Sequence, residues 1–173
     1  MKKTKDQKIA LVSELSDALR SASSTVFVGF KGLNVAEETA MRRALKAESV
    51  KYTVAKKTLI RRVLEALGHK AAEAELPGEV ALAYGLPREE GAADSTAPAR
   101  LIHEFGKKFL GSNKENKLSI LGGIFEGILM GKASMEEIAT IPPMQTLRAM
   151  FAQVINSPRQ RFAVVLSKVA EKK

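Results

Sequence analysis

The chain has 173 residues, of which 45% are hydrophobic and 27% charged, the balance of a globular protein with one domain or one domain plus an appendage. It has no cysteine, which excludes disulfides and thiolate metal sites, and no apolar run approaches the ~20 residues that cross a bilayer. The net charge of +9 divides into +8 for residues 1–70, −4 for residues 71–140 and +5 for residues 141–173, which favours a polyanion as partner over a merely solvated basic surface.

The first half of the chain alternates between helical and strand-like patterns. Thr4 and Gln7 have the spacing of a capping box at the start of the first helix, and Asn34 is a candidate N-cap for the second. The expected elements are a helix at 5–21, a strand at 25–30, a helix at 36–48, a strand at 50–55 and a helix at 56–67.

The second half continues the alternation. After a weakly helical or loop-like segment at 69–76, the expected elements are a strand at 79–85, a helix around 101–109, a strand at 118–125 and a short helix opened by a capping box from Ser134 to Glu137. Pro142 and Pro143 then break the chain, because neither can donate a helical hydrogen bond.

This order predicts an α+β fold with two parts. Residues 1–141 are expected to form a globular domain with helices on one face of a four-stranded sheet, an α/β plait of the ferredoxin-like type. Residues 142–173 are expected to form a protruding amphipathic C-terminal helix.

The stretch KYTVAKKTLIRR at 51–62 combines five Lys and Arg with no acidic residue. Its helical half is amphipathic, so part of this charge is an ordinary polar face. Lys56 and Lys57 need another explanation, because cations at a helix N-terminus are disfavoured by roughly 0.3–1 kcal/mol each. Two ammonium groups, the Thr58 hydroxyl and free backbone N–H groups together would suit an external phosphate.

That phosphate is not predicted to belong to a nucleotide in a P-loop. No glycine precedes Lys57 at the required spacing, and GILMGK at 127–132 is one residue short and is followed by Ala133. Arg42 and Arg43 on the preceding helix add donors. Cations spread over two elements suit the recurring phosphates of a nucleic-acid backbone, and structured RNA in particular.

No catalytic or metal-binding constellation can be identified. His69 and His103 have no ligand partner three or four residues away, and Glu136 and Glu137 are explained by their place at a helix start. We therefore predict no enzyme activity, no cofactor and no metal.

The C-terminal segment contains an internal repeat. RAMFAQVINS at 148–157 aligns with RQRFAVVLSK at 159–168 at a step of eleven residues, close to three helical turns, so both copies face nearly the same side. Pro158 lies between them and predicts a kink. The two apolar patches consist of Leu147, Met150, Phe151, Val154 and Ile155, and of Phe162, Val165, Leu166 and Val169. A helix packed on the domain core and a membrane-surface helix are the alternatives, but the duplication favours two equivalent dockings of acidic partners.

These blocks together resemble a known family. GFKGLNVAEETAMRRALKAESVKYTVAKKTLIRRVLEALG is similar to the N-terminal signature of the bacterial large-subunit ribosomal protein ten family, and LPGEVALAYG, LSILGGIFEGILM and IATIPPMQTLRAMF follow in the family's order. The resemblance implies a structural constituent of the cytoplasmic ribosome, without a membrane partner. It would bind large-subunit ribosomal RNA at the stalk base beside another ribosomal protein. Its C-terminal helix would anchor dimers of the acidic stalk protein that recruits translation factor GTPases.

The residue patterns and the resemblance together define the expected contacts. The RNA-binding set is Lys31, Gly32, Leu33, Arg42, Arg43, Lys51, Lys56, Lys57, Thr58, Arg61 and Arg62. Lys57 stands where the family usually has Asn. Each apolar patch of the C-terminal helix would hold one stalk dimer, hence two dimers per chain. The alternatives are a ribosome-assembly or free RNA-binding factor of the same fold without stalk binding, and a phosphate-handling enzyme for which no nucleophile or base can be named.

Overall fold

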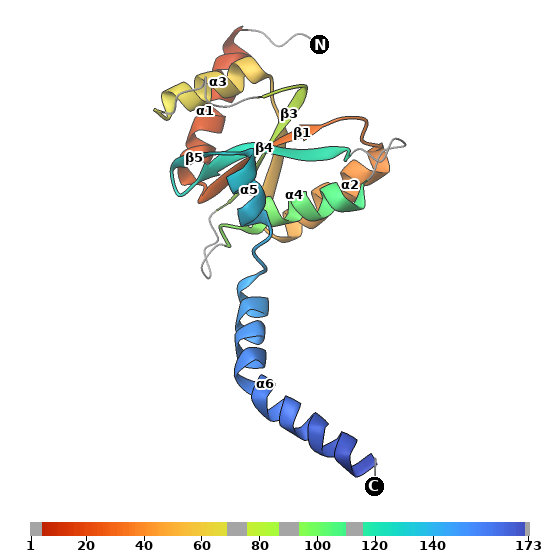
Figure 1. The fold of residues 1–173 in the computed structure, drawn as a ribbon. Coiled ribbons are helices and arrows are strands. Elements are labelled where there is room, and N and C mark those ends of the chain that lie inside the picture. Colours follow the sequence, from red (N-terminus) through yellow and green to blue (C-terminus); the bar gives the residue numbers. More distant parts are fainter. Residues whose placement is uncertain (1–4, 69–75, 87–93, 110–115, 172–173) are drawn as a thin grey trace. The chain divides into compact units, whose positions relative to one another are not determined.

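The protein divides into two compact units, residues 1–141 and residues 142–173, and each is described by itself (Figure 1). The computed structural model describes residues 5–68, 76–86, 94–109 and 116–171. The capping box at Thr4 and most of the weakly helical segment at 69–76 lie outside these ranges.

The order of helices and strands agrees with the expected alternation, with most bounds within two residues. The elements are α1 (Lys5–Ser21), β1 (Ser24–Phe30), α2 (Val35–Ala47), β2 (Val50–Val54), α3 (Lys57–Ala66), β3 (Glu79–Gly85), α4 (Ala97–Lys108), β4 (Leu118–Phe125), β5 (Ile128–Gly131), α5 (Lys132–Ala139) and α6 (Met144–Glu171). The predicted α+β fold with a long C-terminal helix is confirmed.

The sheet is antiparallel throughout, in the order β2-β3-β1-β4-β5. The first four strands have the order of a ferredoxin-like plait, because α2 leads from β1 over to β2 and α4 leads from β3 over to β4. The predicted number of four strands is wrong by one. β5 pairs with β4 at the sheet edge, and its four residues, of which the last is Gly131, are too few to show alternation.

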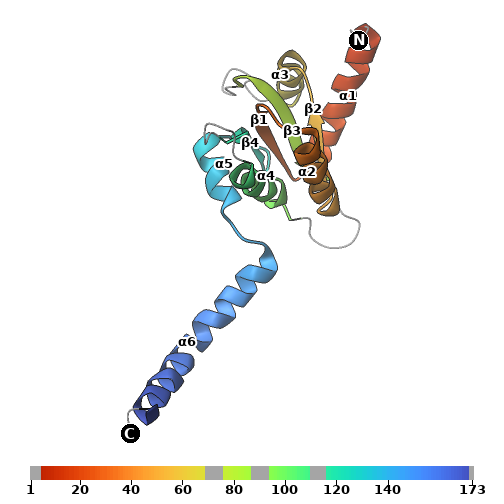
Figure 2. The same cartoon turned by 90° about the vertical axis from the view of Figure 1, so that its right-hand side faces the viewer.

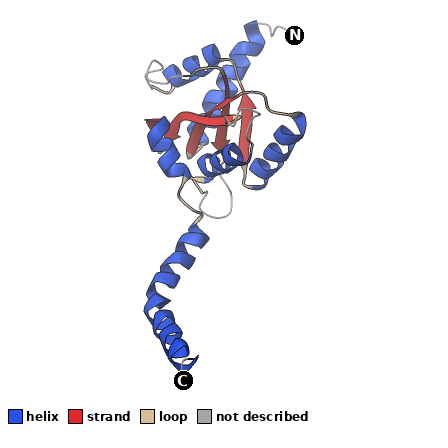
Figure 3. Ribbon diagram, turned by 45° about the vertical axis from the view of Figure 1, so that its right-hand side comes forward, coloured by secondary structure: helices blue, strands red, loops and turns tan. Residues whose placement is uncertain are grey.

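Helices cover both faces of the sheet, whereas one covered face was expected (Figures 1 and 3). α2, α4 and α5 pack on the face to which Val26 and Val28 of β1 point. α1 and α3 pack on the opposite face, around Phe27 and Leu82. Figure 2 shows the strands between α1 on one side and α4 on the other. The second layer exists because α3 is inserted between β2 and β3, where a simple plait has a hairpin.

Two helix starts illustrate how local chemistry sets the boundaries. Asn34 is the N-cap of α2, as predicted, and its backbone N–H donates to the Glu37 carboxylate at 2.9 Å. Lys117 Nζ donates to the same carboxylate at 2.7 Å, and this hydrogen bond lowers the pKa of Glu37 below its usual range. α5 begins at Lys132 after Gly131, so the expected start at Ser134 is wrong by two residues.

The second unit is the helix α6, which contains Pro158 in its interior. The ribbon of α6 bends about halfway along its length (Figure 1), as expected where a proline removes a helical hydrogen bond. No described residue of α6 is buried. Among the described residues, no helix is both long and apolar enough to cross a membrane.

Candidate nucleic-acid interface

The start of α3 concentrates positive charge without local compensation. β2 ends at Val54, Lys56 is the N-cap, and α3 begins at Lys57 with no acidic residue in its first turn. The Lys56 carbonyl accepts from the backbone N–H groups of Leu59 and Ile60 at 2.9 and 3.1 Å. The N–H groups of Lys57 and Thr58 have no acceptor within the described part of the chain. The helix therefore presents backbone donors and ammonium groups together, the arrangement that suits a phosphate.

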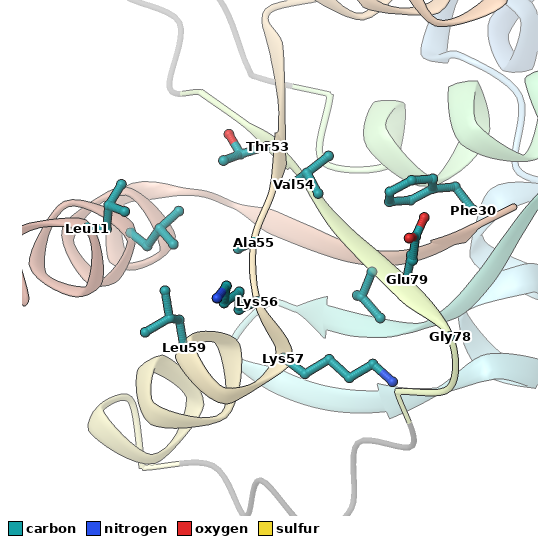
Figure 4. Close-up of a pocket in the computed structure, with 12 residues that line it drawn as sticks. Leu11, Phe30, Thr53, Val54, Ala55, Lys56, Lys57, Leu59, Gly78 and Glu79 are labelled. Atoms are coloured by element: carbon teal, nitrogen blue, oxygen red, sulfur yellow. The ribbon is translucent and has the colours of Figure 1, made fainter. Parts of the chain in front are cut away.

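A groove of about 490 Å³ opens beside this helix start (Figure 4). It exists because β2 leaves the sheet early: its last pair joins Val54 to Ala81, although β3 begins at Glu79. Its lining comes from α1, the strands and the connection to α3. The lining residues are Leu11, Leu15, Phe30, Thr53, Val54, Ala55, Lys56, Lys57, Leu59, Gly78, Glu79 and Val80.

A second groove, of about 570 Å³, lies between the end of α2 and β2. It brings together Arg42, Lys46 and Lys51 around Tyr52. The Arg42 guanidinium donates to the Glu38 carboxylate at 2.7 and 3.0 Å, and Lys51 Nζ lies 3.7 Å from a Glu14 carboxylate oxygen. The cations of this groove therefore include two that are partly compensated within the chain.

Lys46 is the groove residue that the sequence prediction missed. It follows Arg42 by four residues, so the two share a face of α2, and this spacing was a visible signal. Among the described residues Lys46 has no ion pair. Its charge is therefore available to a phosphate, alongside the compensated Arg42.

Tyr52 forms the floor of this second groove. Burial raises the pKa of Tyr52 to about 12, the Glu38 charge adds to the rise, and the Arg42 charge opposes it. The phenol is therefore neutral at physiological pH. Its role at this site is to support the Arg42 side chain by packing and cation–π attraction.

The two grooves of the described residues contain different members of the expected RNA-binding set. Lys56 and Lys57 line the first groove and Arg42 and Lys51 the second. In the described ranges, no ion pair involves the further cations Lys31, Arg43, Lys56, Lys57, Arg61 and Arg62. These side chains are exposed and have no acidic partner among the described residues, and Lys57 differs only in being half-buried.

The turn between β1 and α2 has a different character. Gly32 adopts a φ of 65°, the left-handed region that favours glycine. Leu33 is half-buried and packs against the core on the α2 face. Leu33 therefore anchors the turn, and Gly32 and the exposed Lys31 form the part that faces outward.

No group of three or more metal-ligating side chains occurs within the residues that the structure describes. His103 is half-buried on α4. His69 lies outside the described ranges.

The apolar side chains of α6 are exposed in both copies of the repeat. Phe151 has 69% of its surface exposed and the corresponding Phe162 has 67%. The other exposed members of the two patches are Leu147, Met150, Val154, Ile155, Val165, Leu166 and Val169. Exposed apolar side chains at this density are typical of protein interaction surfaces.

Comparisons with known proteins show the family to which the chain belongs. Residues 3–107 match the model of the family described as ribosomal protein L10. The chain is 35% identical over 173 residues to large ribosomal subunit protein uL10 of Shouchella clausii (strain KSM-K16), covering 100% of this chain and 97% of that protein. Proteins of the same name match in Lacticaseibacillus casei (strain BL23), at 32% identity over 96% of this chain and 92% of the relative, and in Oceanobacillus iheyensis, at 30% over 97% and 94%. The chain therefore belongs to the ribosomal protein L10 family.

Proposed function

We propose that residues 1–141 bind large-subunit ribosomal RNA at the base of the stalk, beside a neighbouring ribosomal protein, and that α6 anchors two dimers of the acidic stalk protein. Family membership makes the chain a structural, non-enzymatic constituent of the large subunit of the cytoplasmic ribosome. The proposal adds the division of labour between the two units.

The uncompensated cations around α3 carry the RNA-binding part of the proposal. Lys56 and Lys57 stand at a helix N-terminus where the chain supplies no acidic residue, so an external anion is needed to offset the unfavourable charge. The exposed Arg61 and Arg62 continue this charge along the same helix. Contacts of this kind position a protein on RNA phosphates and give salt-dependent affinity.

The duplicated exposed patches support the stalk-binding part. Phe151 and Phe162 are eleven residues apart on one helix, each with apolar neighbours exposed to solvent. An amphipathic helix with repeated anchors is suited to a helix-in-groove or bundle interaction, and the net charge of +5 over residues 141–173 suits an acidic partner. A free RNA-binding or assembly factor of the same fold would leave these patches without a purpose.

Reconstitution with large subunits that lack this protein tests the RNA-binding part. The variant Lys56→Ala/Lys57→Ala/Arg61→Ala should co-sediment with subunits much more weakly than the unmodified chain. Lys107→Ala/Lys108→Ala is the control, because these exposed cations lie in the last turn of α4, which packs on the opposite face of the sheet from α3. Equal co-sedimentation of both variants would contradict the proposed interface.

A further inference from the structure

The groove beside α3 contains an aromatic ring and a carboxylate, neither of which is needed to bind a phosphate. Phe30 and Glu79 are directly paired in the β1–β3 ladder, so their side chains lie next to each other on the same face of the sheet. Glu79 is exposed, and it is the one carboxylate among the described residues that line the groove. A carboxylate accepts hydrogen bonds and repels phosphate, so it is out of place in a surface that only binds phosphates.

The side chains around Glu79 form an apolar slot with charged ends. Figure 4 shows Phe30, Val54 and Glu79 on one side of the connection between β2 and α3, with Lys57 extending along the same side toward Gly78. Phe30 is half-buried, so it offers a partly exposed ring, and Val54 is 50% exposed. β3 begins here without β2 beside it, so this end of the sheet is open.

We propose that this slot receives one unstacked nucleobase of the bound RNA, with the base against Phe30 and Val54 and its adjoining phosphate at Lys57 and the start of α3. The inference rests on the proposed RNA binding and adds the recognition of a base to it. Single-stranded RNA bases are recognised by stacking on aromatic side chains and by hydrogen bonds to their edges. A groove volume of about 490 Å³ is that of a small-ligand site.

Glu79 selects among the bases by its hydrogen-bonding capacity. A carboxylate needs donors, and guanine presents an N–H and an amino group side by side on its Watson–Crick edge, matching both carboxylate oxygens. Uracil offers a single N–H between two carbonyl oxygens, which a carboxylate repels. Adenine and cytosine each present an amino group beside a ring-nitrogen acceptor, so guanine alone pairs two adjacent donors with both carboxylate oxygens, and the slot favours guanine.

This chemistry favours a base over an apolar side chain of a neighbouring protein. A protein side chain filling the slot would bury Glu79 beside it without a donor, which is costly for a carboxylate. It would also leave the ammonium groups of Lys56 and Lys57 without an anion. A nucleotide provides the apolar face, the donors and the negative charge in one molecule.

Titration of the full chain with mononucleotides, followed by NMR, tests the base specificity. Guanosine monophosphate should shift the methyl signals of Val54 and Val80, and it should bind several-fold more tightly than inosine monophosphate, which differs only by lacking the amino group. Glu79→Gln should abolish this preference while leaving the fold unchanged, because residue 79 is exposed. Equal binding of the two nucleotides, shifts confined to residues outside the groove, or no saturable shift would each overturn the proposal.

A groove-filling substitution tests the same inference on ribosomal RNA. Val54→Trp should weaken binding to a large-subunit ribosomal RNA transcript by roughly five- to a hundredfold, the usual range for losing one stacked base. The salt dependence should stay unchanged, because no cation is removed. Ile128→Trp is the matched control, since Ile128 is an exposed β-branched residue on the opposite edge strand.

The outcomes separate this inference from the proposed function. If Val54→Trp binds RNA normally while Lys56→Ala/Lys57→Ala binds weakly, the base-binding slot is wrong and RNA binding stands. If both variants bind as tightly as the unmodified chain, the proposed RNA interface fails as well.

Discussion

The guanidinium of Arg42 lies 5.1 Å from the centroid of the Tyr52 ring, and its Nη1 donates to the Tyr52 backbone carbonyl at 3.4 Å. A residue of α2 is thereby held against the edge strand β2. The Glu38 carboxylate holds the same guanidinium from its own helix. The position of this cation is fixed before any RNA binds, so less side-chain freedom is lost on binding.

The buried phenol of Tyr52 should make the folded protein less stable at alkaline pH. Its pKa is about 12 in the folded protein and about 10 when unfolded, so the folded state retains the proton more tightly. The contribution of the protonated Tyr52 to the free energy of unfolding is fully present below pH 10. It falls by about 2 kcal/mol as the pH rises toward 12.

Denaturant unfolding of the unmodified chain and of Tyr52→Phe at several pH values between 9 and 12 measures this dependence. The difference in the free energy of unfolding between the two proteins should fall steadily across that range. A constant difference would show that Tyr52 ionises without resistance from its surroundings.

Removal of the carboxylate that compensates Arg42 should strengthen RNA binding. In Glu38→Gln the Arg42 guanidinium keeps its contact with Tyr52, but the carboxylate that compensates its positive charge is removed. The affinity for a large-subunit ribosomal RNA transcript should therefore rise a few-fold at low salt. Glu104→Gln, an exposed change on α4, is the control. If the two variants bind alike, the second groove takes no phosphate.

Each apolar patch on α6 should hold one dimer. Phe151→Glu and Phe162→Glu place a charge in one patch each, so native mass spectrometry of the co-expressed complex should show two stalk-protein copies per chain instead of four. Val164→Glu is the matched control, because Val164 is 52% exposed but lies on the opposite side of the helix from Phe162. A complex of the unmodified chain with any other ratio than one to four would contradict the two-patch assignment.

Truncation after Ile141 should separate the two activities. The fragment should keep its RNA affinity and a melting temperature close to that of the full chain, because no described residue of α6 is buried. It should lose stalk-protein binding completely. Loss of RNA affinity in the fragment would show that α6 takes part in RNA binding.

Local patterns predicted most of the secondary structure. Val26, Phe27 and Val28 alternate between the two faces of β1, and Leu59, Ile60, Val63 and Leu64 form the buried stripe of α3. Both patterns repeat with the period of the element that they form. The β5 hairpin was missed because its sequence, Ile-Leu-Met-Gly, lacks alternation and is defined only by its pairing with β4.

Features that depend on distant segments were not predicted. The covering of the second face by α1 and α3 follows from tertiary packing, which the period of a single helix does not reveal. Glu79 lies far from Lys57 in the sequence, and only the early end of β2 brings both into one groove. The sequence predicted the candidate site at Lys56 and Lys57, because cations are unfavourable at a helix N-terminus. It did not predict Glu79, because the role of that residue depends on neighbours across the sheet.

The salt dependence of binding to large-subunit ribosomal RNA tests the central claim most directly. The logarithm of the association constant should fall linearly with the logarithm of salt concentration, and Lys56→Ala/Lys57→Ala/Arg61→Ala should reduce the slope by about 2, since each lost phosphate contact removes roughly 0.7–0.9. Lys107→Ala/Lys108→Ala should leave the slope unchanged. A triple variant with the slope and affinity of the unmodified chain would show that the cations of α3 do not face the RNA.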